Sequence, residues 1–161
     1  MLRLTGYDPA TVRKGQIVWV LVAVLALSCL GEAKQLAVVA DKGSDTSNVK
    51  AADLTNILIG KTKTWPDGKV VRVILRDPSS PDMELVLRRL LNMTADQAHT
   101  LFQTHPGQIV VAESDEAVQR LVSSTRGAIG IVDLYSLTKD VNVVKIDGKL
   151  PFDNGYLLKG N

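Results

Sequence analysis

Short apolar runs alternate with amphipathic segments along most of this chain, and this alternation restricts the possible folds more than any other feature. Runs rich in β-branched residues predict strands at 35–41, 69–76, 108–114, 127–134 and 141–148. Apolar residues at helical spacing predict helices in the segments between them, at 49–61, 81–92, 94–103 and 114–124. Five strands interleaved with four helices predict an α/β domain, with a mixed or parallel sheet covered on both faces.

Local boundary signals agree with this order of elements. Thr94 and Gln97 have the T-x-x-Q spacing of a capping box, in which each side chain binds the other residue's backbone amide. Pro81 suits the first position of a helix because it has no amide proton to leave unpaired. Gly60 suits the position after a helix, where a positive φ is common. The glycines of GAIG (127–130) lack the spacing of a dinucleotide-binding loop, and we attribute them to close backbone packing.

The first 33 residues have the three-part layout of a secretory signal. Arg13 and Lys14 form a basic flank, residues 17–30 are all apolar or small, and Ala33 offers a small residue at a cleavage site. A membrane-spanning helix is the alternative, but 17–30 would rise only about 21 Å against about 30 Å of hydrocarbon. We therefore predict a signal peptide over 1–33 and secretion across the inner membrane into the periplasm.

The mature domain is then expected to comprise residues 34–161. Cys29 is the only cysteine in the chain, so cleavage after Ala33 leaves a domain without disulfide or thiol chemistry. Acylation of Cys29 after cleavage at Ser28 is the alternative, and it would anchor the domain to a membrane. We favour the unanchored form, in which the mature domain does not span a membrane.

Composition and charge argue against several classes of function. The net charge is +2 with both signs scattered, and aromatic residues make up 4% of the chain, so we expect no nucleic-acid partner. His99 and His105 are poorly spaced for a metal site. Glu113, Asp115 and Glu116 are interpreted as the solvated start of a helix rather than an acid–base pair. We expect no metal, no cofactor and no enzymatic activity, because no base, nucleophile and oxyanion-stabilising group come together.

The most suggestive residues follow the predicted strand that ends at Arg76. Open α/β sheets bind ligands where a strand ends and a helix begins, because the first amides of the helix are unpaired there. Arg76 would supply a planar fork that matches phosphate or sulfate, and Ser79 and Ser80 would supply hydroxyl donors. Pro81 removes one amide donor, and Asp82 would repel an anion. The alternative interpretation is a capped helix beside a solvated arginine.

Four motifs, in order, resemble those of phosphate ABC transporter substrate-binding proteins (PstS-like). LTNILIGKTKTWPDG (54–68) resembles L-x-x-I-(F/Y)-x-G-K-x-x-x-W-x-D(G), and VVRVILRDPSSPD (70–82) is similar to the strand that leads into R-x-x-x-S-G-T. TRGAIGIVDLYSL (125–137) resembles T-P-G-A-I-G-Y-V, and VNVVKIDGK (141–149) resembles the next segment in that family. The matches run from about 36 to 151 and cover the central, contiguous lobe of that family. Its glycine-rich opening and much of its other lobe have no counterpart.

The resemblance implies a single periplasmic-binding-protein-like lobe that recognises a small oxyanion such as phosphate, with an ABC permease as partner. The family's phosphate-binding arginine and serine fall on Arg76 and Ser80, whereas its glycine and threonine are replaced by Pro81 and Asp82. These departures leave a second interpretation open. The chain would then be a non-transport periplasmic interaction module that keeps the fold, has lost high-affinity anion binding and binds another periplasmic protein.

Overall fold

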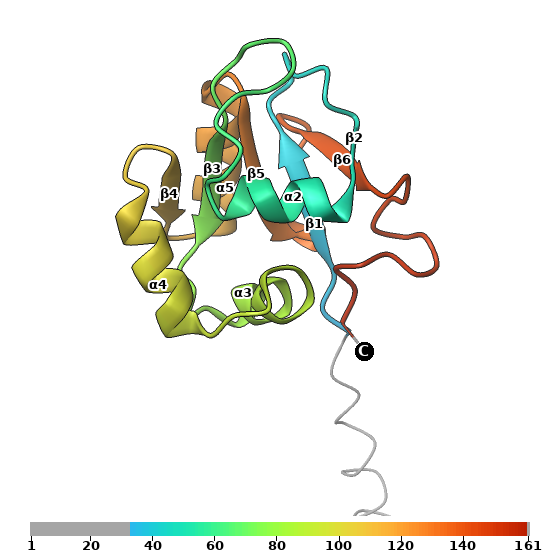
Figure 1. Cartoon of the computed structure of the whole chain (residues 1–161). Helices are drawn as coiled ribbons and strands as arrows, with labels where there is room; N and C mark the ends of the chain where they lie inside the picture. Colours follow the sequence, from blue (N-terminus) through green and yellow to red (C-terminus); the bar gives the residue numbers. More distant parts are fainter. Residues whose placement is uncertain (1–32, 161) are drawn as a thin grey trace, which may run out of the picture. The chain divides into compact units, whose positions relative to one another are not determined.

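A six-stranded mixed sheet organises residues 33–160, the part of the chain that this computed structural model describes (Figure 1). Cys29 and nearly all of the predicted signal peptide lie outside the described residues. The strand order is β2-β6-β1-β5-β3-β4. The strands are β1 (Leu36–Ala40), β2 (Asn48–Val49), β3 (Arg72–Arg76), β4 (Ile109–Ala112), β5 (Ala128–Asp133) and β6 (Asn142–Ile146). The predicted fold class is confirmed, and β2 is a sixth strand in addition to the five predicted.

The helices connect the strands almost as predicted. They are α2 (Ala51–Leu58), α3 (Pro81–Val86), α4 (Ala95–Thr104) and α5 (Asp115–Ser124), with a π-helical η2 (Leu87–Leu91) and a 3-10 turn η3 (Leu134–Ser136). The capping box is confirmed, since the Thr94 hydroxyl accepts from the Gln97 amide and the Gln97 side chain accepts from the Thr94 amide. The helix predicted over 81–92 divides into α3 and η2, and it ends at Asn92 with a φ of 48°. Within residues 33–160, no helix has the length and apolar character needed to cross a membrane.

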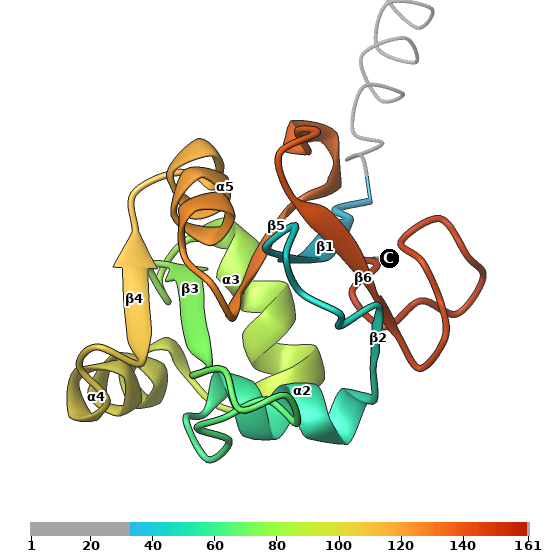
Figure 2. The ribbon, with the colours of Figure 1, turned by 90° about the horizontal axis from the view of Figure 1, so that it is seen from above.

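Helices cover both faces of the sheet, with α5 on one side and α2, α3 and α4 on the other (Figure 2). Successive side chains of a strand point to opposite faces, and β3 shows this clearly. Val73 and Leu75 belong to the core under α2, α3 and α4, which also contains Phe102. Ile74 belongs to the core under α5, which also contains Val118. Strands buried on both faces in this way account for the continuous apolar runs in the sequence.

The direction of the strands brings distant residues to one edge of the sheet. β3 is parallel to both β4 and β5, so Arg76, Ala112 and Asp133 all lie at the edge where these strands end. β1 runs antiparallel to β5 with Leu36 opposite Asp133, so the segment that precedes β1, including Lys34, reaches the same edge. We call this the carboxyl edge, and Arg76 and Lys34 of the candidate site lie there.

The two glycines of GAIG lie where backbones approach closely, as predicted. A Cβ on Gly127 would lie 2.4 Å from the carbonyl oxygen of Val70, and Gly127 has a φ of +76°. A Cβ on Gly130 would lie 2.9 Å from the carbonyl oxygen of Ile74 and 2.8 Å from Cγ1 of Val118. Any side chain at either position would push the backbone or α5 away from the sheet.

Candidate functional site

Arg76 ends β3 with its guanidinium beside two carboxylates. Its Nη1 lies 3.0 Å from Oδ1 of Asp115 and 3.5 Å from Oδ2 of Asp82. The Arg76 side chain is only 23% exposed, so these ion pairs are partly shielded from water and are stronger than surface pairs. The structure thus differs from both interpretations of the sequence. Arg76 is neither a solvated arginine beside a capped helix nor a cation left unpaired for an anion.

Asp115 is the most firmly held member of this group. Its side chain is 9% exposed, and its Oδ2 accepts hydrogen bonds from the Asp133 amide and the Ser136 hydroxyl, both at 2.9 Å. The interpretation of Asp115 as part of a solvated helix start is therefore wrong, although its neighbour Glu116 is exposed. Parallel pairing of β3 with β4 places the start of α5 next to the end of β3. The contact of Asp115 with Arg76 could not be predicted from the sequence, because it depends on the strand order.

Asp82 links Arg76 to a fourth charged residue, Lys34. Asp82 lies in the first turn of α3, and its Oδ1 pairs with Nζ of Lys34 while its Oδ2 faces Arg76. Lys34 is near because β1 begins at the carboxyl edge. We call Lys34, Arg76, Asp82 and Asp115 the charge cluster; it contains two cations and two anions, so its formal charges cancel.

The two predicted serine ligands have different surroundings. Ser79 is exposed, and both its amide and its hydroxyl donate to Oδ1 of Asp77, the amide at 2.8 Å. These bonds, the hydroxyl's most of all, hold the pKa of Asp77 below its ordinary value of 3.8, and His99 lies 3.4 Å from the same oxygen. Ser80 is the N-cap residue of α3 but its side chain makes no capping bond. Its hydroxyl oxygen is buried without a partner.

Unpartnered polar atoms concentrate at this turn. Three buried side-chain polar atoms in residues 33–160 have no hydrogen-bond partner: Arg76 Nε, Ser80 Oγ and Tyr156 Oη. Burial also raises the pKa of the Tyr156 phenol. A buried donor without an acceptor costs about 1–3 kcal/mol, and such atoms are uncommon in native proteins. Two of the three belong to residues that the sequence predicted as ligands, so the β3–α3 turn has hydrogen-bonding capacity that the protein itself does not use.

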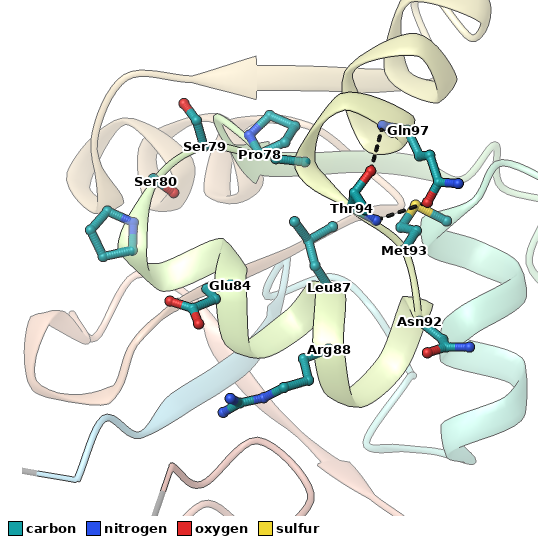
Figure 3. Close-up of a pocket in the computed structure, with 12 residues that line it drawn as sticks. Pro78, Ser79, Ser80, Glu84, Leu87, Arg88, Asn92, Met93, Thr94 and Gln97 are labelled. Carbon is teal, nitrogen blue, oxygen red and sulfur yellow. Dashed lines mark hydrogen bonds between the residues drawn. The ribbon is translucent and has the colours of Figure 1, made fainter.

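A hollow of about 640 Å³ lies beside the turn (Figure 3). Residues of the turn, α3, η2 and the start of α4 line it: Pro78, Ser79, Ser80, Pro81, Glu84, Leu87, Arg88, Asn92, Met93, Thr94, Ala95 and Gln97. Figure 3 shows the two serines on one side and the hydrogen-bonded Thr94 and Gln97 on the other, with Leu87 between them. Arg76 does not line this hollow. The structure therefore places the serines beside the hollow and Arg76 in the charge cluster.

Comparisons with known proteins identify the fold. No protein-family model and no curated protein matches the sequence. An ABC-type phosphate transport receptor from Vibrio cholerae matches with a TM-score of 0.68 and 17% identity, over 80% of this chain and 54% of that one. PstS from Borrelia burgdorferi matches with a TM-score of 0.65 and 23% identity, over 80% and 55%. A putative phosphate ABC transporter substrate-binding protein with bound phosphate, from Clostridium perfringens, matches with a TM-score of 0.63 and 16% identity, over 74% and 47%.

These matches confirm the predicted resemblance at the level of the fold. The chain spans about half the length of the phosphate-binding proteins that it resembles. Those three proteins are binding or transport proteins by name, and none is named as an enzyme.

Proposed function

We propose that this chain is a solute-binding lobe of the phosphate-binding type, which recognises a small oxyanion such as phosphate at the β3–α3 turn through Arg76, Ser79 and Ser80. The observation that carries this proposal is the pair of buried donors, Arg76 Nε and Ser80 Oγ, that lack partners in the protein. A tetrahedral oxyanion presents several acceptor oxygens and satisfies donors that approach from different directions. The shared fold with phosphate-binding proteins supports the same class of ligand.

The charge cluster makes the expected affinity low. Arg76 already pairs with Asp115 and Asp82, and an incoming anion must compete with both carboxylates. The hydroxyl of Ser79 is engaged with Asp77, and Pro81 has no amide to donate. We therefore expect a Kd of about 1 mM, equivalent to a binding free energy of about −4 kcal/mol.

Calorimetric titration of the full chain, purified in a mild detergent, tests this proposal. Phosphate and sulfate are titrated to about 20 mM at constant ionic strength, and saturable heat from at least one anion is expected. Arg76→Ala should abolish the heat. Arg126→Ala is the matched control, because Arg126 is exposed and precedes β5 at the opposite edge of the sheet; it should bind as the wild type does.

A second variant keeps the test valid if Arg76→Ala unfolds, since that change leaves the buried carboxylate of Asp115 without its cation. Ser80→Ala removes a hydroxyl that has no partner in the protein, so the free energy of unfolding should not fall. Binding should weaken several-fold if the hydroxyl donates to the anion. Absence of heat from the wild type, or undiminished binding by a folded Ser80→Ala protein, would contradict the proposal.

The proposal includes export. Residues 1–33 would serve as the signal peptide, residues 34–161 would form the mature domain in the periplasm, and an ABC permease would be the partner. The basic flank and the apolar segment 17–30 support this. The intact mass of the protein purified from the periplasm should correspond to a chain that begins at Lys34. A mass that corresponds to acylated Cys29 would instead establish a lipid anchor.

A second candidate function is a periplasmic interaction module without transport, and one observation favours it. Arg76 is held by Asp115 and Asp82. This is expected if a former anion site now serves only to hold β3, α3 and α5 together through ion pairs. Capture of one specific partner from periplasmic extract by both the wild type and Arg76→Ala, together with no heat from either anion, would support this candidate. Capture lost in Arg76→Ala would contradict it.

A further inference from the structure

The two carboxylates on Arg76 are held very differently. Asp115 accepts three hydrogen bonds at 2.9–3.0 Å and is 9% exposed. Asp82 reaches Arg76 only at 3.5 Å and is 18% exposed. A contact of 3.5 Å is at the outer limit of a hydrogen bond and weaker than one at 3.0 Å. Asp82 is therefore the carboxylate that can leave Arg76, whereas Asp115 cannot move without breaking its bonds to Asp133 and Ser136.

Asp82 also has another partner when it leaves. Its Oδ1 already pairs with Lys34, whose side chain is 37% exposed, while its Oδ2 faces Arg76. A carboxylate that moves away from Arg76 toward Lys34 keeps an ion pair, so the movement does not strand a charge. Lys34 comes from the segment before β1 and Arg76 from the end of β3. Asp82 thus bridges the two cations, so it can give up its contact with Arg76 and keep its pair with Lys34.

We propose that Asp82 is an internal competitor for the site: it occupies Arg76 when no anion is present, and an anion binds by displacing it toward Lys34. This inference rests on the proposed function, and it names the residue that sets the affinity of that site. A carboxylate within a few ångströms of a bound anion also repels it. At the effective dielectric of a protein surface this repulsion alone weakens binding by about tenfold or more.

Calorimetric titration of the full chain with inorganic phosphate tests the inference. Asp82→Asn keeps the shape of the side chain and removes its charge, so phosphate should bind at least about tenfold more tightly than to the wild type. Asp53→Asn is the matched control, because Asp53 is an exposed aspartate in the first turn of another helix, α2. It changes the net charge equally and should leave the affinity unchanged.

Lys34→Gln tests the displacement itself. Without Lys34, Asp82 has only Arg76 as a partner, so phosphate should bind more weakly than to the wild type. In the Asp82→Asn background the same substitution should have a smaller effect, because no carboxylate remains to be drawn away. Equal effects in the two backgrounds would show that Lys34 acts only through its own charge, and would overturn the displacement.

The results separate this inference from the proposed function. If Asp82→Asn binds no more tightly than Asp53→Asn, the inference is overturned even where the wild type binds phosphate. If Asp82→Asn binds phosphate and the wild type does not, the proposed function of the wild type fails while the role of Asp82 stands. If neither binds, both are overturned. Thermal unfolding of each variant confirms that the proteins compared are folded.

Discussion

Replacing Asp115 with alanine should lower the free energy of unfolding by about 3 kcal/mol. Asp115 accepts from Arg76 at 3.0 Å and from Asp133 and Ser136 at 2.9 Å. Asp115→Ala removes this acceptor from all three donors, although the Ser136 hydroxyl keeps the Asp133 carbonyl oxygen at 3.1 Å. Each loss costs at least about 1 kcal/mol when the donor is largely buried. Removing one member of a fully buried ion pair costs about 3–5 kcal/mol. Arg76 is 23% exposed and keeps Asp82 nearby, so the lower end of that range applies.

Urea unfolding monitored by circular dichroism measures this loss. It is a large part of the free energy of unfolding of a typical domain, which is about 5–15 kcal/mol. Glu113→Ala is the control, because Glu113 is exposed and only two residues away; it should change stability by less than about 0.5 kcal/mol. Asp115→Asn retains one acceptor oxygen, so its free energy of unfolding should fall less than that of Asp115→Ala. In an Arg76→Met background, Asp115→Ala should cost at least about 1 kcal/mol less, since the two residues interact directly. Equal unfolding midpoints for Asp115→Ala and Glu113→Ala would refute the anchoring role of Asp115.

Two further predictions concern the backbone and the turn. Gly127→Ala should lower the free energy of unfolding, measured with urea, by more than about 2 kcal/mol, because it adds a clash with the Val70 carbonyl to the strain of a positive φ. Gly68 is the control, since it has a similar φ of +84° and open space around it. An equal loss of stability in Gly127→Ala and Gly68→Ala would contradict the packing argument. The pKa of Asp77 is lowered in the folded protein by its bonds from Ser79, so its contribution to stability is present above the ordinary value of 3.8 and is lost as pH falls through the lowered value. The difference in melting temperature between the wild type and Asp77→Asn should therefore close as pH falls below 3.8, and a difference that persists unchanged in strong acid would contradict this.

Features of the fold that depend on neighbouring residues could be predicted from the sequence. The capping box of Thr94 and Gln97 and the positive φ of Gly60 involve only residues within a few positions of one another. β2 could not be predicted, because its two residues pair with β6 almost a hundred positions later. A strand so short has no periodicity of its own. The change to a π-helix at Leu87 likewise could not be predicted, because Met83, Leu87, Leu90 and Leu91 have ordinary α-helical spacing.

The candidate site shows the same division between local and distant information. The motif that resembles phosphate-binding proteins names residues of one strand, one turn and one helix, and it locates Arg76 and Ser80. Asp82, one of the charges that decide whether Arg76 is available, lies within the same motif. The other two charges come from distant elements, because Asp115 follows β4 and Lys34 precedes β1. Their proximity to Arg76 depends on the order and direction of the strands, which no local sequence pattern encodes.

The strand order that gathers donors at the carboxyl edge gathers acceptors there as well, so a matched ligand motif is not sufficient for binding. The deciding property is whether each acceptor can move when an anion arrives. Asp115 is fixed by the Asp133 amide and the Ser136 hydroxyl and will remain on Arg76. Asp82 has a second cation within reach. If an anion binds at this turn, the bound state must therefore keep the pair of Arg76 with Asp115 and replace only the contact with Asp82. Displacement of Asp82 frees the Nη1 donor that it faced on Arg76. Nε of Arg76 and the hydroxyl of Ser80, which have no partner in the described part of the chain, would then be further donors to the anion.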